Sequence, residues 1–499
     1  MDAAITRRAF LAGAAVAIPL VRVAGQAGPM PAAADVVVIG GDPAALAATW
    51  RLAQTPGLRV VLVQDAVPWA PPASPLPASV AELPPFVRGH EAGFDGWRDA
   101  GNPGWAYADV LPSFKRLERY EAGASAQRGG EGPVPVAHCW DPHPGHRAFL
   151  LACNSGGFAQ DSRHDFNGPR SQSVGGYYQK VYADDRPMSF EAALVDPVRT
   201  RVGVSVVSGA AVTRVVLDGR RAVGVEVARG SERQVVSAGR GVILGAPPVR
   251  AAQILMASGI GPADHLRNVG IPVVVDRPGV GTTLHDQMRV ALHYAALPPA
   301  LAWPESTVTG GFFTVSLVAS PPDLQMDFVD PRRAGAARLG LDITMVQPTS
   351  RGTVRLAAAD AAQAPVVTLN ALATEGDVTA LVQGIRLGRL VGASPQLDRF
   401  RGDELKASAA ARSTPELQAY VRSASKPCGH LAGGCAMGPA GDAQAVVDAT
   451  LAVHGVEGLR VAGTAVMPMV VNAPPDAAAL MIGERCAEFL LAAGPVAAP

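Results

Sequence analysis

The stretch DVVVIGGDPAA, residues 35–45, decides the fold of this 499-residue chain. Its first five residues form a nearly continuous apolar run, which is typical of a strand buried on both faces. The pair Gly40-Gly41 ends that run, and residues 44–54 have the apolar spacing of a helix. Residues 58–63, LRVVLV, predict a second strand. Together these segments predict a β-α-β unit of about 30 residues, the size of the unit that opens a dinucleotide-binding domain.

The turn after the first strand departs from the dinucleotide-binding pattern G-x-G-x-x-G at its second glycine. Gly40 suits the tight turn, and Ala45 suits the close packing of the helix on the strand. Asp42 stands where the second glycine would let a pyrophosphate approach, and it adds a negative charge there. Gln64 stands near the end of the second strand, where an acidic residue usually accepts ribose hydroxyls. We predict Gly40, Gly41, Ala45 and Gln64 as cofactor-binding residues; a β-α-β unit without a ligand also fits this pattern.

The composition is that of a globular protein with a small-molecule substrate. Hydrophobic residues make up 48% and charged residues 17%, which excludes the disordered class. Lys+Arg and Asp+Glu are both 43, so the formal net charge of zero argues against a nucleic-acid-binding protein. The length predicts two or more domains or one large two-lobed fold. Five cysteines are too few, and odd in number, for a disulfide scaffold.

Residues 1–27 differ from the rest of the chain. Arg7-Arg8 precedes a short apolar run, residues 12–21, and small residues around Ala27 follow. That run is shorter than the roughly 20 residues that a membrane-spanning helix needs. The pattern predicts a signal peptide of the twin-arginine type with cleavage near Ala27, although a chance arginine pair in a leader also fits. We expect a periplasmic or extracellular protein with no integral membrane span.

Several later stretches, in order along the chain, resemble motifs of the glucose-methanol-choline (GMC) family of flavin oxidoreductases. They are RGHEAGFDGW (88–97), GNPGW (101–105), DVLPSFKR (109–116), SGIGP (258–262), PGVG (278–281), QPTSRGTVRL (347–356), HGVEGLRV (454–461) and MIGERC (481–486). The resemblance covers nearly all of residues 35–495. It implies an α/β fold, with a Rossmann-like FAD-binding domain and an α+β substrate domain that holds a large antiparallel sheet.

The same resemblance implies a discontinuous domain organisation. The flavin-binding-type domain would take residues 35–70, 195–290 and 440–495, and the connecting segment and substrate domain would take residues 71–194 and 291–439. Residues 353–356 alternate between apolar and polar side chains, so we expect them in a strand of the antiparallel sheet. Residues 378–391 have helical spacing.

The family's proton acceptor lies in an HxxGTCxMG motif, and this chain has HLAGGCAMG beginning at His430. The resemblance implies that His430 takes an alcohol proton while a hydride leaves the same carbon, although a packing histidine is the alternative. The family's second catalytic position falls on Pro474, which is neither donor nor base. Asn472, two residues earlier, is predicted to substitute for it. Cys428 and Cys435 flank His430, but their spacing matches no usual zinc pattern, and we predict no metal.

The motifs that touch the flavin in the family are altered here, whereas the scaffold motifs match. Residues 76–82 replace a glycine-serine loop, and PPVRAA, residues 247–252, replaces GAxNSP. The motif GxNLxDH reads GTTLHDQ, residues 281–287, and the aspartate after the LRV strand is Gly463. The pattern predicts a GMC scaffold with a degenerate flavin site.

Three interpretations therefore stay open. In the first, FAD is the cofactor and the chain oxidises an alcohol with His430 as base. In the second, a flavin-free enzyme uses His430 for proton transfer in an isomerisation, elimination or lyase reaction. In the third, the chain is a non-catalytic homologue or partner subunit. The sequence defines neither the substrate nor the electron acceptor.

Overall fold

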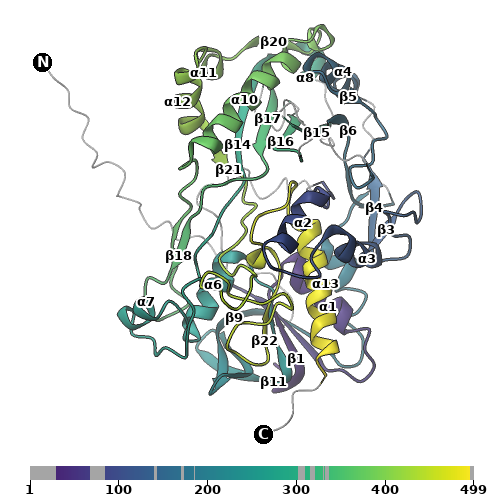
Figure 1. The fold of residues 1–499 in the computed structure, drawn as a ribbon. Coiled ribbons are helices and arrows are strands. Elements are labelled where there is room, and N and C mark those ends of the chain that lie inside the picture. Colours follow the sequence, from purple (N-terminus) through teal and green to yellow (C-terminus); the bar gives the residue numbers. More distant parts are fainter. Residues whose placement is uncertain are drawn as a thin grey trace, which may run out of the picture.

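The computed structural model describes residues 30–494 apart from 68–84, 140–142, 170–172, 185, 302–308, 315–320, 330 and 332–336. Its elements form two lobes, which lie one above the other in Figure 1. The predicted signal peptide, residues 1–27, and the stretch 76–82 lie outside the described residues.

The first lobe is built on a six-stranded sheet with the order β1-β2-β9-β10-β11-β22, in which β1 also pairs with β11. Its strands are β1 (Ala33–Ile39), β2 (Val60–Asp65), β9 (Val204–Asp218), β10 (Arg221–Arg229), β11 (Glu232–Leu244) and β22 (Leu459–Val461). The strand β1 runs parallel to both β2 and β11, and its residues 36–39 are fully buried. The sequence prediction of a central parallel strand with Gly40 at its carboxyl end is confirmed. The second strand runs two residues further than predicted, so Gln64 lies inside β2.

Two helices far apart in the sequence pack together on this sheet. Helix α1 (Pro43–Leu52) follows β1 directly, and α13 (Asp476–Ala492) closes the described chain. They lie side by side in Figure 1, where α13 is yellow. A Cβ atom built on Gly483 would lie 2.1 Å from the carbonyl oxygen of Ala44, so only glycine allows this approach. The other helices of the lobe are α5 (Phe190–Leu194), α6 (Pro248–Ala257) and α7 (Ala263–Asn268), with the short pair β12 (Ile260–Gly261) and β13 (Val275–Asp276) and the 3-10 turn η3 (Thr464–Val466).

The second lobe holds an eight-stranded sheet with the order β20-β14-β17-β16-β15-β6-β5, and β21 pairs with β14 off that path. Its strands are β5 (Ala159–Gln160), β6 (Val174–Tyr177), β14 (Met288–Ala296), β15 (Thr309–Phe313), β16 (Leu324–Val329), β17 (Arg338–Met345), β20 (Arg401–Glu404) and β21 (Lys426–Pro427). All its pairings are antiparallel except that of β5 with β6. The predicted fold class, a Rossmann-like domain with an antiparallel-sheet substrate domain, is confirmed.

Helix α10 (Glu375–Gly392) covers the apolar face of the second sheet, as its helical spacing predicts. Cβ atoms built on Gly384 and Gly388 would lie 2.5 Å and 2.8 Å from the side chain of Ile343, so these glycines let the helix approach the strands closely. The remaining elements around this sheet are α4 (Pro144–Ala152), η1 (Cys153–Gly156), α8 (Pro298–Leu301), η2 (Pro395–Leu397), α11 (Lys406–Ala409) and α12 (Thr414–Ala424).

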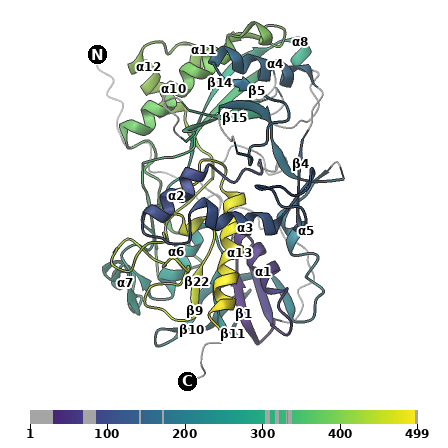
Figure 2. The same ribbon diagram turned by 45° about the vertical axis from the view of Figure 1, so that its right-hand side comes forward.

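The connecting segment lies between the two sheets, as both views show (Figure 1, Figure 2). It contains α2 (Glu91–Asp99), α3 (Tyr107–Leu117) and the sheet β3-β4-β7-β8, formed by β3 (Glu118–Tyr120), β4 (Val134–His138), β7 (Gln179–Ala183) and β8 (Arg186–Pro187). A buried ion triad stabilises it: Glu118 accepts from Arg88 at 2.7 Å and from Arg128 at 2.8 Å. None of the helices in the described part of the chain has the length and apolar composition needed to cross a bilayer.

The expectation for residues 353–356 is wrong. Strand β18 (Thr353–Arg355) pairs with β19 (Val366–Thr368) in a separate two-stranded sheet. Val354 and Leu356 belong to the hydrophobic core of the first lobe, and the backbone N–H of Val354 donates to the carbonyl of Gly281 at 2.8 Å. Alternation shows that one face of a strand is buried, but it does not show which core buries that face.

Candidate active site

The loop that carries His430 follows β21 and is held by one carboxylate. Asp286 accepts hydrogen bonds from the backbone N–H of His430 at 2.8 Å and of Gly429 at 3.0 Å. Asp286 is 5% exposed, and burial raises its pKa to about 7 although these hydrogen bonds oppose the shift. Asp286 therefore fixes the backbone from which the imidazole of His430 projects.

The side chain of Gln287 fixes the tautomer of His430. Its Nε2 atom is surrounded by three carbonyl oxygens, those of Val346 at 2.8 Å, Val471 at 3.2 Å and Ala473 at 3.2 Å. Because only an N–H group can face three acceptors, the amide oxygen must be the atom that lies 2.7 Å from Nδ1 of His430. Nδ1 then carries the proton of the neutral ring, and Nε2 keeps a lone pair.

The electrostatic surroundings keep His430 neutral. Burial is the main cause, and the positive charge of Arg289 adds to it; together they lower the pKa of His430 to about 4. Arg289 is itself paired with Asp342 at 3.0 Å. On the neighbouring strand Asp327 accepts from the hydroxyl of Tyr178 at 2.8 Å. Polar side chains thus line the sheet next to a histidine that is in its basic form above about pH 4.

Asn472, the predicted second catalytic residue, is buried close to the groups that hold Gln287. The residues on either side of it, Val471 and Ala473, provide two of the carbonyls that bind Gln287. Its own Nδ2 donates to the carbonyl of Pro322 at 2.9 Å, while its Oδ1 has no hydrogen-bond partner among the described residues. That oxygen lies toward Gly93, where a built Cβ would meet it at 2.8 Å. A catalytic role for Asn472 stays a prediction.

The predicted phosphate turn lies at the carboxyl end of β1. Gly40 has φ +122°, and a Cβ built there would lie 2.2 Å from the carbonyl oxygen of Gly245, so this position requires glycine. Around Gly41 the turn is open, with no described atom within 4 Å of a built Cβ. Ala45 packs against Gly245, whose built Cβ would lie 3.0 Å from it. The backbone shape of the turn is that of a dinucleotide-binding unit.

The side chains at this turn include two acidic groups. Asp42 is the N-cap residue of α1, yet its side chain makes no capping hydrogen bond. Burial, with the nearby Asp476 as a second cause, raises the pKa of Asp42 to about 7. Burial also raises the pKa of Asp476, in the first turn of α13, to about 6. Two acidic groups therefore stand where the α1 N-terminus would otherwise attract an anion.

The polar groups at the end of β2 are engaged within the chain. Gln64 donates from Nε2 to Glu191 at 3.0 Å, and its Oε1 accepts from the hydroxyl of Ser208 at 2.6 Å. Asp65, the next residue, forms an ion pair with Arg250 at 2.5 Å. The structure thus places Gln64 at the predicted position but leaves neither end of its amide without a partner.

Gly463, which stands in place of the family's aspartate, follows β22 with φ +88° and ψ −160°. A Cβ built there would lie 3.1 Å from the Cβ of Ala44. That backbone conformation is close to exclusive to glycine. An aspartate would be strained at this position, so the backbone conformation itself favours glycine over the family's aspartate.

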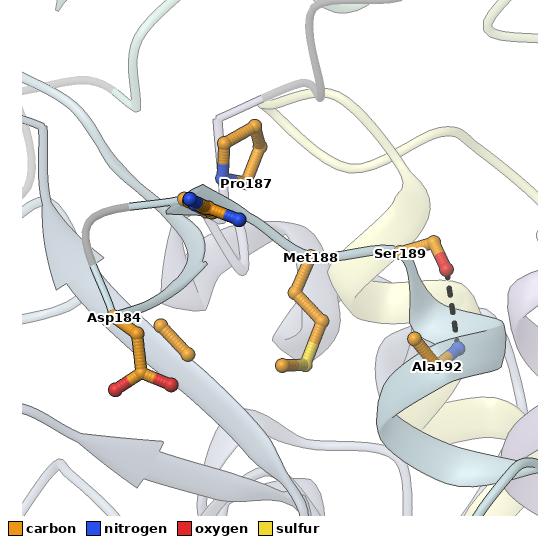
Figure 3. A pocket seen from close by; sticks show the side chains of 7 residues that line it. Asp184, Pro187, Met188, Ser189 and Ala192 are labelled. Atoms are coloured by element: carbon orange, nitrogen blue, oxygen red, sulfur yellow. Dashed lines mark hydrogen bonds between the residues drawn. The ribbon is translucent and has the colours of Figure 1, made fainter.

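Elsewhere, a hollow of about 660 Å³ lies between the β7–β8 hairpin and α5, lined by Asp184, Arg186 and Met188 among others (Figure 3). In the same view the hydroxyl of Ser189 accepts from the backbone N–H of Ala192 at 3.1 Å. The hollow contains none of the predicted site residues. Within the described residues, no group of three or more His, Cys, Asp or Glu side chains could hold a metal ion.

Comparison with known proteins identifies the family. Two family models, both described as GMC oxidoreductase, match residues 80–289 and 348–483. Oxygen-dependent choline dehydrogenase of Brucella suis is 30% identical over 534 aligned residues, which cover 93% of this chain and 96% of that protein. The chain belongs to the GMC oxidoreductase family. Mouse mitochondrial choline dehydrogenase is 34% identical over 436 residues, covering 81% of this chain and 73% of that protein.

Solved structures share the GMC fold. Pyridoxine 4-oxidase from Mesorbium loti superposes with a TM-score of 0.80 at 24% identity, covering 91% of this chain and 98% of that one. A variant of Aspergillus oryzae formate oxidase studied for FAD modification superposes with a TM-score of 0.83 at 20% identity, covering 94% and 99%. The fold of this chain is therefore an FAD-binding fold with a substrate domain.

Two residues of the GMC site were missed as functional candidates in the sequence. Gln287 counted only as a departure from the GxNLxDH motif, and Arg250 only as part of PPVRAA. For Gln287 a signal existed, because its position ends a motif that the family shares. For Arg250 the sequence offered no signal, because its partner Asp65 lies 185 positions away.

Proposed function

We propose that this chain binds a small-molecule alcohol and that Nε2 of His430 accepts the proton of the hydroxyl group. The support is the state of the imidazole: Gln287 holds the proton at Nδ1, at 2.7 Å, so Nε2 offers a lone pair. A pKa of about 4 keeps that lone pair available at neutral pH. A general base must be in this form before the substrate binds.

FAD-dependent oxidation of the CH–OH group is the first candidate reaction. The choline dehydrogenases among the relatives are named for the oxidation of an alcohol. In this reaction Nε2 of His430 would take the hydroxyl proton, and the carbon that bears the hydroxyl would lose a hydride to the flavin as the two-electron oxidant.

A flavin-free proton transfer is the second candidate. It is favoured by the residues that stand where the family would bind the nucleotide part of FAD. Gln64 and Asp65 are bonded within the chain, and the backbone at Gly463 disfavours the family's aspartate. In this reaction His430 removes the same hydroxyl proton, and an isomerisation, elimination or lyase step follows. Both candidates therefore begin with one step at one atom.

Activity screening tests the shared step. Alcohols are assayed with an artificial electron acceptor, and candidate non-redox substrates are assayed without one. We expect His430→Ala to lower turnover by roughly 10²–10⁴-fold, the usual effect of removing a positioned base. His430→Asn, which keeps a hydrogen bond but cannot take a proton, should behave alike. The matched control is His454→Ala, because the ring of His454 is hydrogen-bonded to the carbonyl of Gly438, at 3.0 Å, and His454 is not a predicted site residue.

Retention of activity by His430→Ala would contradict the role of His430 as the base and would leave it at most a structural histidine. A measured activity that needs an acceptor would select the oxidation, and one that proceeds without an acceptor would select the non-redox reaction. A chain inactive in both screens would favour a non-catalytic homologue.

We also propose that the chain is exported in folded form by its N-terminal segment. The support is Arg7-Arg8 before an apolar run of about the length of a signal peptide core. Replacing both arginines by lysine should leave the precursor in the cytoplasm, as measured by cell fractionation. Normal export of the double variant would contradict the proposal.

A further inference from the structure

An open parallel sheet binds its ligand in the crevice at the carboxyl ends of its strands. In the first lobe that edge contains Gly40 after β1 and Gln64-Asp65 at the end of β2. The pyrophosphate of a dinucleotide belongs at the first of these ends, and its adenosine ribose belongs at the second. The first end is open around Gly41, whereas the second is filled by side chains of the chain itself.

Asp65 uses both of its carboxylate oxygens inside the protein. Oδ2 accepts from Nε of Arg250 at 2.5 Å. Oδ1 accepts from the backbone N–H groups of Val212 at 3.0 Å and Val67 at 3.3 Å. The side chains of Asp65 and Arg250 are 6% and 2% exposed. Both oxygens are thus bonded within the protein, and the burial of the pair leaves little of this carboxylate accessible to a ribose hydroxyl.

Arg250 lies in the first turns of α6, and each of its three side-chain nitrogens has an acceptor. Nε donates to Asp65, and Nη1 donates to Oε1 of Gln253 at 2.7 Å and to the carbonyl of Ala361 at 3.0 Å. Nη2 donates to the carbonyl of Val212 in a short hydrogen bond. The backbone N–H and C=O of Val212 are therefore both occupied, one by the carboxylate and the other by the guanidinium.

The side chain of Gln64, the residue before Asp65, is also bonded within the protein at this edge of the sheet. Gln64 donates to Glu191 on α5 at 3.0 Å and accepts from Ser208 on β9 at 2.6 Å. Its amide thus connects β2 to a helix and to the neighbouring strand. Each end of the Gln64 amide and each carboxylate oxygen of Asp65 already has a partner within the protein, so the polar groups of residues 64–65 are oriented toward the protein rather than toward an adenosine.

We propose that the buried Asp65–Arg250 pair takes the place of the adenosine half of a dinucleotide, so that the chain is stable without FAD and does not retain FAD on purification. Admitting an adenosine would require Arg250 to leave, and each member of a buried ion pair is costly to leave unpaired. The inference concerns binding only. Its failure is measured by ligand titration and is distinguishable from a failure of the role proposed for His430.

The test compares three probes on the full chain by calorimetric titration. ADP carries the adenosine without a flavin, FMN carries the flavin without the adenosine, and FAD carries both. The variants are Arg250→Met, which removes the guanidinium but keeps an apolar stem, and Asp65→Asn, which weakens the pair with little change in shape. The matched control is Arg267→Met, because Arg267 forms an exposed ion pair with Asp264 in the same lobe.

We expect the purified wild-type chain to lack the visible absorbance of a flavin. Arg250→Met should bind ADP at least about tenfold more tightly than the wild type, and Arg267→Met should equal the wild type. FMN affinity should be the same in all of these proteins. If Arg250→Met does not fold by circular dichroism, the ADP comparison is made with Asp65→Asn, for which we expect the same direction.

Three results would overturn the inference. The first is a wild-type chain that purifies with stoichiometric FAD. The second is a folded variant of Arg250 or Asp65 that binds ADP no more tightly than the wild type, because the barrier to adenosine would then lie elsewhere. The third is an equal gain in FMN and ADP affinity, because that would indicate general loosening of the lobe.

Discussion

Both the surroundings of His430 and the end of β2 depart from the GMC motifs, but the substituted side chains bind different kinds of partner. At position 287 a glutamine stands where the motif has histidine, and its amide still binds the imidazole at 2.7 Å. At the end of β2 the altered side chains bind one another, with Asp65 and Arg250 at 2.5 Å. The first change leaves Nε2 of His430 with the lone pair that we propose accepts the substrate proton. The second leaves both carboxylate oxygens of Asp65 occupied.

The effect of a motif substitution thus depends on the hydrogen-bond partners of the new side chain rather than on the residue type alone. Gln287 is fully buried, and its amide must satisfy both ends because an unpaired buried polar group is costly. Three carbonyls take the nitrogen, so the oxygen faces His430. Arg250 is also buried, and its three nitrogens are bonded to acceptors at the end of β2 and in neighbouring segments.

The largest effect on stability should come from breaking the Asp65–Arg250 ion pair at the end of β2. Arg250→Met leaves the carboxylate of Asp65 buried without its cation, so we expect the free energy of unfolding to fall by about 3–5 kcal/mol. Urea denaturation measures this change. Adding Asp65→Leu removes the stranded charge and should recover part of the loss. A loss no larger than that of the exposed control Arg267→Met would contradict a buried, mutually dependent pair.

Substitutions in the surroundings of His430 should change the turnover rather than the stability. Gln287→Leu removes the acceptor of the Nδ1 proton, so the ring can place its proton on either nitrogen. We expect kcat to fall roughly 10–10²-fold, as for other residues that orient a catalytic histidine, with KM little changed. Steady-state kinetics measure the split. The control is Gln54→Leu, at an exposed glutamine; an equal effect there would remove the positioning role from Gln287.

The pH profile gives a second test of the same contact. As the proposed base, His430 must be neutral to accept a proton, so activity should be lost as the pH falls through its pKa of about 4. Gln287→Glu places a carboxylate beside Nδ1 and favours the imidazolium. The acid limb of the profile should therefore move to higher pH by about one unit or more. An unmoved limb would show that another group controls it.

The smallest expected effect concerns the phosphate turn between β1 and α1. The pKa of Asp42 is raised from 3.8 to about 7, so the folded state binds a proton that the unfolded state releases. Stability must then fall as the pH rises from about 4 to 7. Asp42→Asn removes this dependence, so the variant should gain about 1–3 kcal/mol over the wild type across that range. Urea denaturation at several pH values, with Asp264→Asn as the control, would contradict this assignment if the gain did not grow with pH.

The sequence by itself determined the elements whose signals are local. The apolar run of β1, the Gly40 turn and the amphipathic spacing of α10 depend on residues close together in the chain, and the structure has them where they were predicted. The motif that begins at His430 placed the candidate base, because a shared motif carries its own backbone geometry. The fold class followed from many such local matches in order.

Only the tertiary structure decided which partners those residues meet. Gln287 and His430 are 143 positions apart, and Asp65 and Arg250 are 185 apart. The alternation of residues 353–356 was local and correct as a strand, but the core that buries it was not predicted. A local pattern reports how a segment presents its faces. The choice between an open and a closed site depends on which distant donor or acceptor the folded chain brings to each face.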